Sequence, residues 1–412
     1  MTPKLRLMLL AIAVASAGVY WSGLMATFAQ SAAPWTLTLN SMQVPAAEGS
    51  GPQLRSSSRG VILSWVESND AGTSLKIAKR TTSQWTSAMT VAAGEDWFVT
   101  DADTPSVLEL SNGMLVANWM QSASDQYEAS NLRLTYSKDG GKTWAPSVLP
   151  HHDGTDTQHA FATLFELPGP NLGVVWLDGR QTIKDREHGP MQLRYTTYDA
   201  QFKQQPEVAI DTKVCDCCTT SIATTPEGPI VAFRNRTDAE VRDIYVSRFV
   251  AGKWTEGTVV HNDAWTIHAC PVNGPAVSAH GRDLAVAWFT AKGEEGHAFV
   301  AFSADAGRTF GQPIRLDDAT STGAVGVEML DDGSAVATWM EFADKRSQFR
   351  VRRVERSGAK SAAITVAGAS GARVKGVPRL ARYADQLVFA WAETPERGGD
   401  SQVRSAFAVL KK

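Results

Sequence analysis

Hydrophobic positions recur along the chain in seven similar segments, each a short strand, a turn and an apolar strand that ends in an aromatic residue. Three of these segments read TPSVLELSNGMLVANWM, GPAVSAHGRDLAVAWFT and VPRLARYADQLVFAWAE. The terminal aromatics, which we call the anchoring aromatics, are 51 to 57 residues apart and are Trp65, Trp119, Trp176, Phe233, Trp288, Trp339 and Trp391. A steady β-patterned period of this length predicts a propeller with four short strands in each blade.

The number of segments predicts an all-β fold, a β-propeller of seven four-stranded blades, with six blades and an accessory strand pair as the alternative. The seventh segment ends without an outer strand, whereas Trp35–Val44 has a strand pattern and no blade of its own. We therefore expect this N-terminal strand to close the last blade, which also removes a sheet edge.

A turn motif follows two of the segments, in SKDGGKTW and SADAGRTF. Its aspartate can accept hydrogen bonds from the turn backbone, its glycine supplies unusual dihedral angles, and its final aromatic fixes the turn to the blade. The motif predicts a structural role for Asp139, Gly141, Trp144, Asp305, Gly307 and Phe310.

Composition and the N-terminal residues bear on location and partners. The net charge is -3 with 20% charged residues, so no basic surplus is present to neutralise a nucleic acid. Lys4 and Arg6 precede a long apolar run and a small-residue stretch, which is typical of an export signal. We expect residues 1–29 to be a signal peptide or an uncleaved membrane anchor, and 30–412 to be one propeller domain that is periplasmic or secreted. Membrane contact would come only through that anchor.

One face of the propeller is expected to collect the chemically active side chains. The first strand of each blade lies nearest the axis, and ligand sites usually lie where first strands begin and second strands end. First-strand starts bring Asp101, Asp103, His159, Cys217, Cys218, His268 and Cys270 to this face. Second-strand ends bring Glu67, Asp178, Arg180, Arg234, Arg236, Glu341 and Glu393.

Three of the four cysteines lie together in VCDCC, and Cys270 follows about one blade repeat later, so all four should meet near the axis. A disulfide from Cys217 or Cys218 to Cys270 would tie two blades and suits an exported protein. A copper or zinc site of Cys215, Cys217, Cys218, Cys270 and His268 is the second interpretation. A redox-active thiol is the third. Strand geometry would put Cys215 and Cys217 on one side and Cys218 on the other.

Arginines at the second-strand ends predict an anionic ligand, because the planar guanidinium binds carboxylate, phosphate or sulfate at two points. The candidate ligand-binding residues are Arg180, Arg234 and Arg236, with His159 from a first-strand start. The alternative for Arg180 is a structural ion pair with Asp178.

Carboxylates on the same face suggest acid/base chemistry. Asp103 and Asp178 are the candidate catalytic residues, and Glu341 and Glu393 are expected on the same face. A hydrolase with two carboxylates fits this set, although the sequence does not select the pair.

The turn motifs and the repeat resemble the sialidase superfamily of Asp-box propellers across nearly the whole of residues 30–412. The stretches CDCC, FRNRTDAEVRDI and CPVNGP are similar to those of a group of bacterial exported proteins described as sialidase-like. The resemblance implies a propeller and, for true sialidases, an arginine triad, a tyrosine–glutamate pair and an aspartic acid catalyst.

This chain departs from the sialidase pattern at two places. Where the family has its first arginine, the sequence reads SGPQLR, so Arg55 is displaced and is expected to point elsewhere. The tyrosine nucleophile has no counterpart, since Tyr383 falls in a turn away from the axial face.

The sequence therefore predicts an exported propeller with one axial ligand site, for which three functions remain open. The first is a glycoside hydrolase that acts on an anionic glycan. The second is a non-enzymatic protein with a cysteine and histidine site for copper or zinc, and the third is a scaffold for protein interactions.

Overall fold

The structure is a computed structural model, and it describes residues 35–46, 48–81, 84–126, 128–185, 189–368, 372–395 and 399–410. Residues 32–412 form one compact unit. The expected signal peptide or anchor at 1–29 lies outside the described residues. None of the described residues forms a helix long and apolar enough to cross a membrane.

Seven antiparallel sheets make up the fold, which confirms the predicted seven-bladed propeller. Blades one to three contain β2 (Ser50–Ser57), β3 (Gly60–Asn69), β4 (Gly72–Lys79) and β5 (Met89–Gly94); β6 (Ser106–Glu109), β7 (Leu115–Ser122) and β8 (Ser130–Ser137); and β9 (His159–Leu167), β10 (Asn171–Asp178), β11 (Met191–Tyr198) and β12 (Val208–Val214). Blade two is completed by a single bridge between Leu134 and Val148.

Blades four and five contain β13 (Ser221–Thr225), β14 (Gly228–Arg234), β15 (Ile244–Val250), β16 (Lys253–Trp254) and β17 (Thr258–Val259); and β18 (Ala276–His280), β19 (Asp283–Thr290), β20 (His297–Ser303) and β21 (Ile314–Arg315). Blades six and seven contain β22 (Thr320–Met329), β23 (Ala335–Ala343), β24 (Arg346–Val354) and β25 (Ile364–Ala367); and β26 (Ala372–Tyr383), β27 (Gln386–Pro395), β28 (Gln402–Val409) and β1 (Asn40–Met42).

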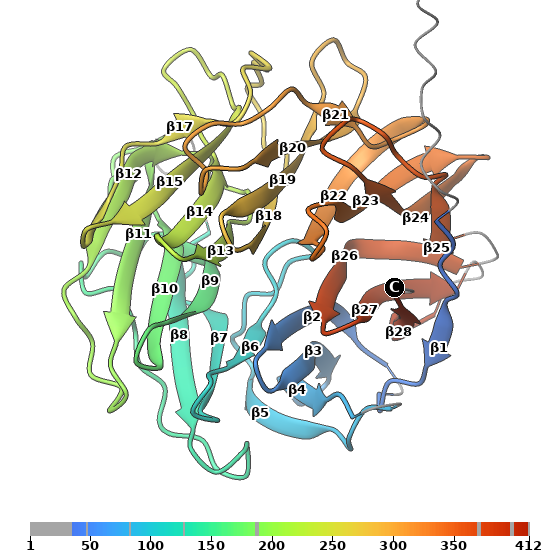
Figure 1. Ribbon diagram of the computed structural model, residues 1–412. Coiled ribbons are helices and arrows are strands. Elements are labelled where there is room, and N and C mark those ends of the chain that lie inside the picture. Colours follow the sequence, from blue (N-terminus) through green and yellow to red (C-terminus); the bar gives the residue numbers. More distant parts are fainter. Residues whose placement is uncertain are drawn as a thin grey trace, which may run out of the picture. The chain divides into compact units, whose positions relative to one another are not determined.

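The first strand of each blade faces the centre of a closed ring (Figure 1). Each innermost strand contacts the innermost strand of the next blade, in the order β2, β6, β9, β13, β18, β22, β26 and back to β2. The seven innermost strands therefore form a closed ring around the axis.

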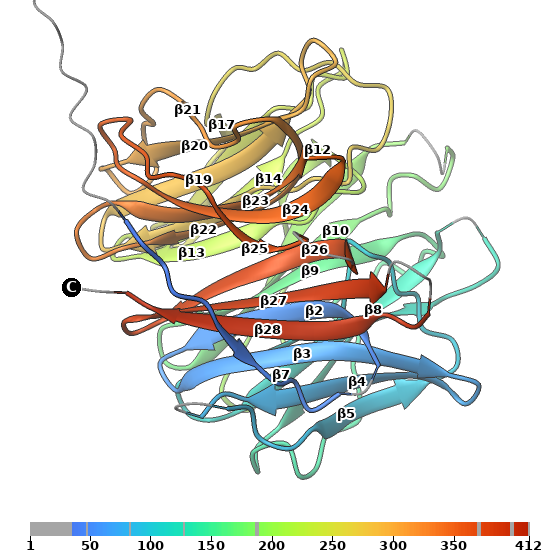
Figure 2. The same ribbon diagram turned by 90° about the vertical axis from the view of Figure 1, so that its right-hand side faces the viewer.

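Strand β1 pairs with β28, and Asn40 lies opposite Phe407 and Met42 opposite Ser405. This pairing confirms that the N-terminal strand closes the last blade, and Figure 2 shows β1 crossing beside β28. Because the first and last strands of the chain pair in one sheet, opening the ring at this blade would break the hydrogen bonds between β1 and β28.

The hydrophobic core is divided among the seams between blades, and all seven anchoring aromatics are buried in it. One cluster joins Val116 and Leu134 of blade two to Val174 and Trp176 of blade three. Four anchoring tryptophans also donate their indole N–H to a carboxylate two residues later, in the pairs Trp65–Glu67, Trp176–Asp178, Trp339–Glu341 and Trp391–Glu393. These carboxylates at the second-strand ends therefore have a structural role.

The two turn motifs are held by their aspartates. Asp139 accepts hydrogen bonds from the backbone N–H groups of Lys142 and Thr143 and from the hydroxyl of Thr143. Asp305 makes the corresponding bonds to Arg308 and Thr309. The motif glycines, four residues after the motif serine, have positive φ, 94° at Gly141 and 78° at Gly307. Trp144 and Phe310 pack against neighbouring apolar clusters.

Candidate functional site

A cavity of about 390 Å³ lies along the axis of the propeller. Residues from all seven innermost strands line it, together with Ala102, Thr219 and the segment 272–275 from the loops that lead into blades two, four and five. Its volume falls within the usual range of small-molecule sites, which are concave and contain a few converging polar groups. The axial ligand site predicted from the sequence therefore has a physical counterpart in this cavity.

Strand register divides the cavity wall into levels. The residues paired with the position before each anchoring aromatic form one level, which is Gln53, Ser106, Thr163, Ser221, Ala276, Gly326 and Arg379. All of them except Ser106 and Thr163 line the cavity. Two residues further along the strands the next level is Arg55, Leu108, Phe165, Ala223, Ser278, Glu328 and Ala381. Each level contains one arginine, and the two arginines come from adjacent blades.

Arg55 and Arg379 are the cationic residues of this wall, and neither forms an ion pair among the described residues. The Arg55 side chain has no hydrogen-bond partner in the described part of the chain, and its Nε is buried. Arg379 donates a single long hydrogen bond, of 3.4 Å, from Nε to the carbonyl of Pro52. Burial lowers the pKa of both side chains, that of Arg379 to about 9, and the charge of Arg55 contributes to the lowering at Arg379.

Two carboxyl groups in or beside the cavity wall have raised pKa values. Burial raises the pKa of Glu328, which lines the cavity and accepts a hydrogen bond from the Ser278 hydroxyl, to about 7. Burial also raises the pKa of Asp103 to about 7, opposed by the Phe161 N–H that it accepts and by the charge of Arg379. Both groups can therefore exchange protons near neutral pH, as a general acid or base requires.

The raised pKa of Asp103 predicts a pH-dependent stability. A carboxyl whose pKa is higher in the folded than in the unfolded protein stabilises the fold at low pH, and this contribution is lost as pH rises through the folded value. Between about pH 4.5 and about pH 8, the free energy of unfolding of the wild type should fall by about 3 kcal/mol relative to that of Asp103→Asn. Urea denaturation at several pH values measures this difference, and parallel pH profiles would contradict it.

The predicted catalytic residue Asp178 and the predicted ligand residues His159 and Arg180 form a buried network with one another. Asp178 and His159 are both 0% exposed. Asp178 accepts hydrogen bonds from Trp176 Nε1 and, through both oxygens, from Arg180. Arg180 is also paired with Glu207. Arg180 and Asp178 therefore form the structural ion pair that was the alternative to ligand binding. Asp178 has no exposed surface with which to act on a ligand.

His159 belongs to a compact group with His151 and Asp153. The two imidazole rings stack with their centroids 3.6 Å apart, and Asp153 Oδ1 lies 3.0 Å from His159 Nε2 and 3.5 Å from His151 Nδ1. The group has metal-ligand geometry, yet His159 Nδ1 also contacts two backbone carbonyls, of Ser130 and Thr157. These contacts place His159 in the interior rather than at the cavity.

The predicted ligand residue Arg234 is a buried brace between blades four and five. It is 2% exposed, and its guanidinium donates to the carbonyls of Asn273, Arg242 and Phe289. The same group stacks over Trp265. Three backbone acceptors occupy the donors with which Arg234 was expected to bind an anion, so that expectation is corrected.

Arg236 is likewise buried, and its Nε donates to both carboxylate oxygens of Glu240. The expected anion site therefore does not form at Arg180, Arg234 and Arg236, because local carboxylates and carbonyls occupy all three. The expectation that Arg55 points elsewhere is also corrected, since Arg55 lines the cavity.

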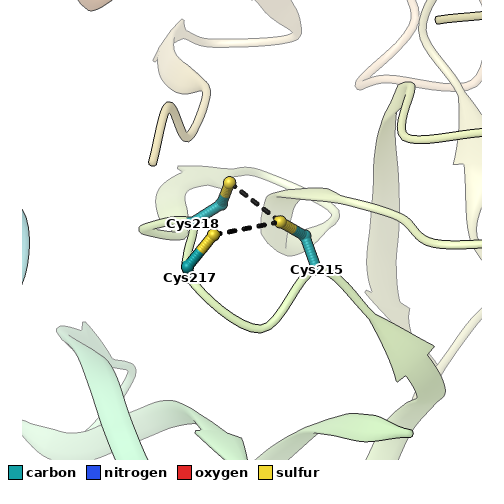
Figure 3. A group of neighbouring side chains, drawn as sticks. All are labelled: Cys215, Cys217 and Cys218. Atoms are coloured by element: carbon teal, nitrogen blue, oxygen red, sulfur yellow. Dashed lines mark hydrogen bonds between the residues drawn. The ribbon is translucent and has the colours of Figure 1, made fainter. Parts of the chain in front are cut away.

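The cysteines meet at the loops that precede blades four and five. Cys217 and Cys270 form a disulfide with their Cα atoms 6.0 Å apart, within the range that a disulfide requires. Cys215 and Cys218 are free and buried. Their Sγ atoms are 3.0 Å apart, and Cys215 Sγ lies 3.8 Å from Cys217 Sγ. Figure 3 shows the side chains of Cys217 and Cys218 both directed toward that of Cys215. The sequence expectation that Cys218 faces away from Cys215 is wrong, because 215–220 is a turn rather than a strand.

His268 does not join the cysteines. It is exposed and is absent from the three groups of metal-ligand side chains found among the described residues. Two of those groups contain cysteines, namely Cys215 with Cys217 and Cys218, and Asp216 with Cys217 and Cys270. A copper or zinc site that uses Cys217 or Cys270 would require the disulfide to be reduced, because a metal binds the thiolate. The metal site stays a prediction.

No protein-family profile and no curated protein matches the chain. Solved structures do match it. The polysaccharide lyase Uly1 matches at 12% identity and a TM-score of 0.54, over 89% of this chain and 91% of that one. The α-L-arabinofuranosidase Arb93A of Fusarium graminearum, bound to an iminosugar inhibitor, matches at 12% identity and a TM-score of 0.47, over 91% and 98% of the two chains. NanB with optactamide matches at 9% identity and a TM-score of 0.45, over 85% and 83%. At these identities the likeness concerns the propeller fold.

Proposed function

We propose that the protein binds an anionic glycan in the axial cavity and cleaves it, with Asp103 as the acid/base group. The observation that carries this proposal is the pair of cavity arginines, Arg55 and Arg379, which have no carboxylate partner among the described residues. Two partly buried cations on adjacent blades repel, and partial burial removes some of the water that would otherwise solvate them. A bound anion would relieve both costs.

The shape of the guanidinium favours a planar or tetrahedral oxyanion as the ligand. Each arginine offers a fork of N–H donors that fits the two oxygens of a carboxylate or sulfate. In the cavity these forks extend from adjacent blades at neighbouring levels. The carboxylate or sulfate of an acidic sugar can therefore be held between them, while Gln53 and Ser278 offer further polar contacts for hydroxyl groups.

Cavity size and fold support a saccharide ligand. A volume of about 390 Å³ favours the end of a saccharide chain over an extended segment. The fold of a polysaccharide lyase is similar to this propeller over most of both chains. That likeness concerns fold alone, so the assignment of a saccharide rests mainly on the cavity.

Asp103 has the protonation behaviour that the cleavage step needs. With a pKa of about 7, its carboxyl holds a proton in part of the molecules at neutral pH and can donate it to the leaving oxygen of a glycosidic bond. The carboxylate then takes a proton from the attacking water, which restores the starting state. Its position beside Arg379 couples this proton transfer to the bound anion.

The test of this function is cleavage of a panel of glycans. Polygalacturonate, a sialylated oligosaccharide and a sulfated glycan represent the anionic class, and amylose represents the neutral class, with released sugar ends as the measurement. We expect cleavage within the anionic class alone. Asp103→Asn should lose about 100-fold or more in rate while it retains glycan binding.

Asp101→Asn is the matched control, because Asp101 lies two residues away and pairs at the surface with Lys375. It should keep the wild-type rate. Cleavage of amylose at a similar rate, or an unchanged rate in Asp103→Asn, would contradict the proposal. Binding of an anionic glycan without cleavage would remove the enzymatic part and leave a binding protein.

A further inference from the structure

Four cysteines lie close together at the start of blade four, and their burial differs from one to the next. Cys215 and Cys218 are 1% and 2% exposed, Cys217 is partly buried and Cys270 is exposed. Cys215 is the central member, since the sulfurs of Cys217 and Cys218 both lie next to its own (Figure 3). A buried pair of thiols thus adjoins a surface disulfide.

We propose that these cysteines form a thiol–disulfide relay, in which a disulfide passes between the surface pair Cys217–Cys270 and the buried pair Cys215–Cys218. The geometry supplies both steps of the transfer. Cys215 Sγ is 3.8 Å from Cys217 Sγ, the nearer sulfur of the disulfide, and 3.0 Å from Cys218 Sγ. This activity is independent of the proposed function in the axial cavity.

In the first step the Cys215 thiolate attacks Cys217 Sγ. The Cys215–Cys217 bond forms, the Cys217–Cys270 bond breaks, and the electron pair leaves on Cys270 as a thiolate. Cys270 is exposed, so water stabilises this leaving group and can protonate it. In the second step Cys218 attacks Cys215 Sγ, its proton passes to Cys217, and Cys217 leaves. One disulfide is broken and one formed, so no external oxidant or reductant is consumed.

The surroundings of Cys215 favour its action as the nucleophile. Arg242 Nη1 lies 3.5 Å from Cys215 Sγ and can donate a hydrogen bond to its thiolate. The buried Arg242 side chain is held at this place by ion pairs with Asp216 and Glu240. The backbone N–H of Cys215 is bonded to the carbonyl of Arg234, which fixes the loop against β14.

Burial gives the two states of the relay different reactivities. With the disulfide at Cys217–Cys270, the remaining thiols are buried and cannot meet a large partner. After the transfer, the free thiols are Cys217 and Cys270, of which Cys270 is at the surface. This dithiol can pass two electrons to the disulfide of another exported molecule, which leaves both disulfides of this chain formed. A dithiol reductant then restores the one-disulfide state.

Time-resolved alkylation tests the relay. The one-disulfide form of the protein is exposed to iodoacetamide at neutral pH, quenched with acid at intervals, and its modified cysteines are located by peptide mass spectrometry. We expect Cys270 to become alkylated in the wild type, because alkylation traps the surface dithiol whenever the disulfide moves inward. In Cys215→Ser the rate of Cys270 alkylation should fall by about tenfold or more, since the nucleophile is missing.

A second variant keeps the test decisive if Cys215→Ser folds poorly. In Cys218→Ser the first step remains but the second cannot follow, so a Cys215–Cys217 disulfide should accumulate and Cys270 should be alkylated. Circular dichroism and thermal melting confirm the fold of each variant before alkylation.

Two results would overturn the relay. Alkylation confined to Cys215 and Cys218 in the wild type would show a static disulfide. Four alkylated cysteines, appearing only after a chelator releases zinc or copper in metal analysis, would show a metal site instead and would support the second interpretation of the sequence.

Discussion

Replacement of Arg55 by methionine is expected to raise the free energy of unfolding of the ligand-free protein by about 1–3 kcal/mol and to abolish the binding of anionic saccharides. Arg55 lines the axial cavity, and its side chain has no hydrogen-bond or ion-pair partner among the described residues. Its charge contributes to lowering the pKa of Arg379. A lowered arginine pKa means that the charged form is less stable in the folded than in the unfolded protein at neutral pH. Removal of this charge should therefore stabilise the fold.

This combination of opposite effects separates a binding residue from a structural one. Urea denaturation measures stability, and calorimetric titration with an anionic saccharide measures binding. Arg404→Met is the matched control, because Arg404 is 49% exposed, is paired with Glu393 and lies on the outer part of blade seven. It should change neither quantity by much. A loss of stability in Arg55→Met together with normal binding would remove Arg55 from the proposed site.

Replacement of Arg234 by methionine should have the reverse effect, a loss of at least about 3 kcal/mol in the free energy of unfolding. The variant leaves the carbonyls of Asn273, Arg242 and Phe289 without their donor in the interior, and it removes the contact of the guanidinium with Trp265. An unsatisfied buried acceptor is more costly than the net gain from an ordinary hydrogen bond.

Urea denaturation of Arg234→Met beside Arg356→Met tests this brace, since Arg356 is 40% exposed and makes one surface ion pair with Asp283. The control should lose less than about 1 kcal/mol. If Arg234→Met is as stable as the control but has lost saccharide binding, the sequence-based assignment of Arg234 as a ligand residue is correct and the brace is not.

The fold could be predicted from the sequence because each of the seven repeats carries the same strand pattern. Trp65, Trp176 and Trp339 occupy equivalent buried sites in their blades. An irregular spacing in one repeat therefore does not obscure the pattern, because the other repeats show it too. The closing strand could be predicted because the seventh blade lacked an outer strand, while the N-terminal strand pattern had no blade of its own. The structure pairs the two.

The site was less accessible, because a side chain's partners depend on neighbours that are distant in sequence. Arg234 and Arg180 sit at strand ends, where ligand residues are common, but the structure surrounds them with carbonyls and carboxylates. A signal for the two cavity arginines was present. Alignment of the repeats on their anchoring aromatics places arginine on the wall-lining stretch of the innermost strands in blades one and seven, at Arg55 and Arg379.

The cysteine loop shows where the alternation of side chains along a strand cannot be used for prediction. The repeat brought Cys217 and Cys270 to adjacent blades, and one of the three interpretations, the disulfide, is the one that the structure contains. The positions of Cys215 and Cys218 could not be derived in this way, because the chain turns between them and brings residues three apart into contact.

The most direct test of the axial anion site is calorimetric titration of the native protein with D-glucuronate and with D-glucose, its carboxyl-reduced counterpart. The cavity arginines predict saturable binding of glucuronate at a single site, lost in Arg55→Met, and no measurable heat from glucose. Equal heats from both sugars, or glucuronate binding that survives in both Arg55→Met and Arg379→Met, would contradict the account.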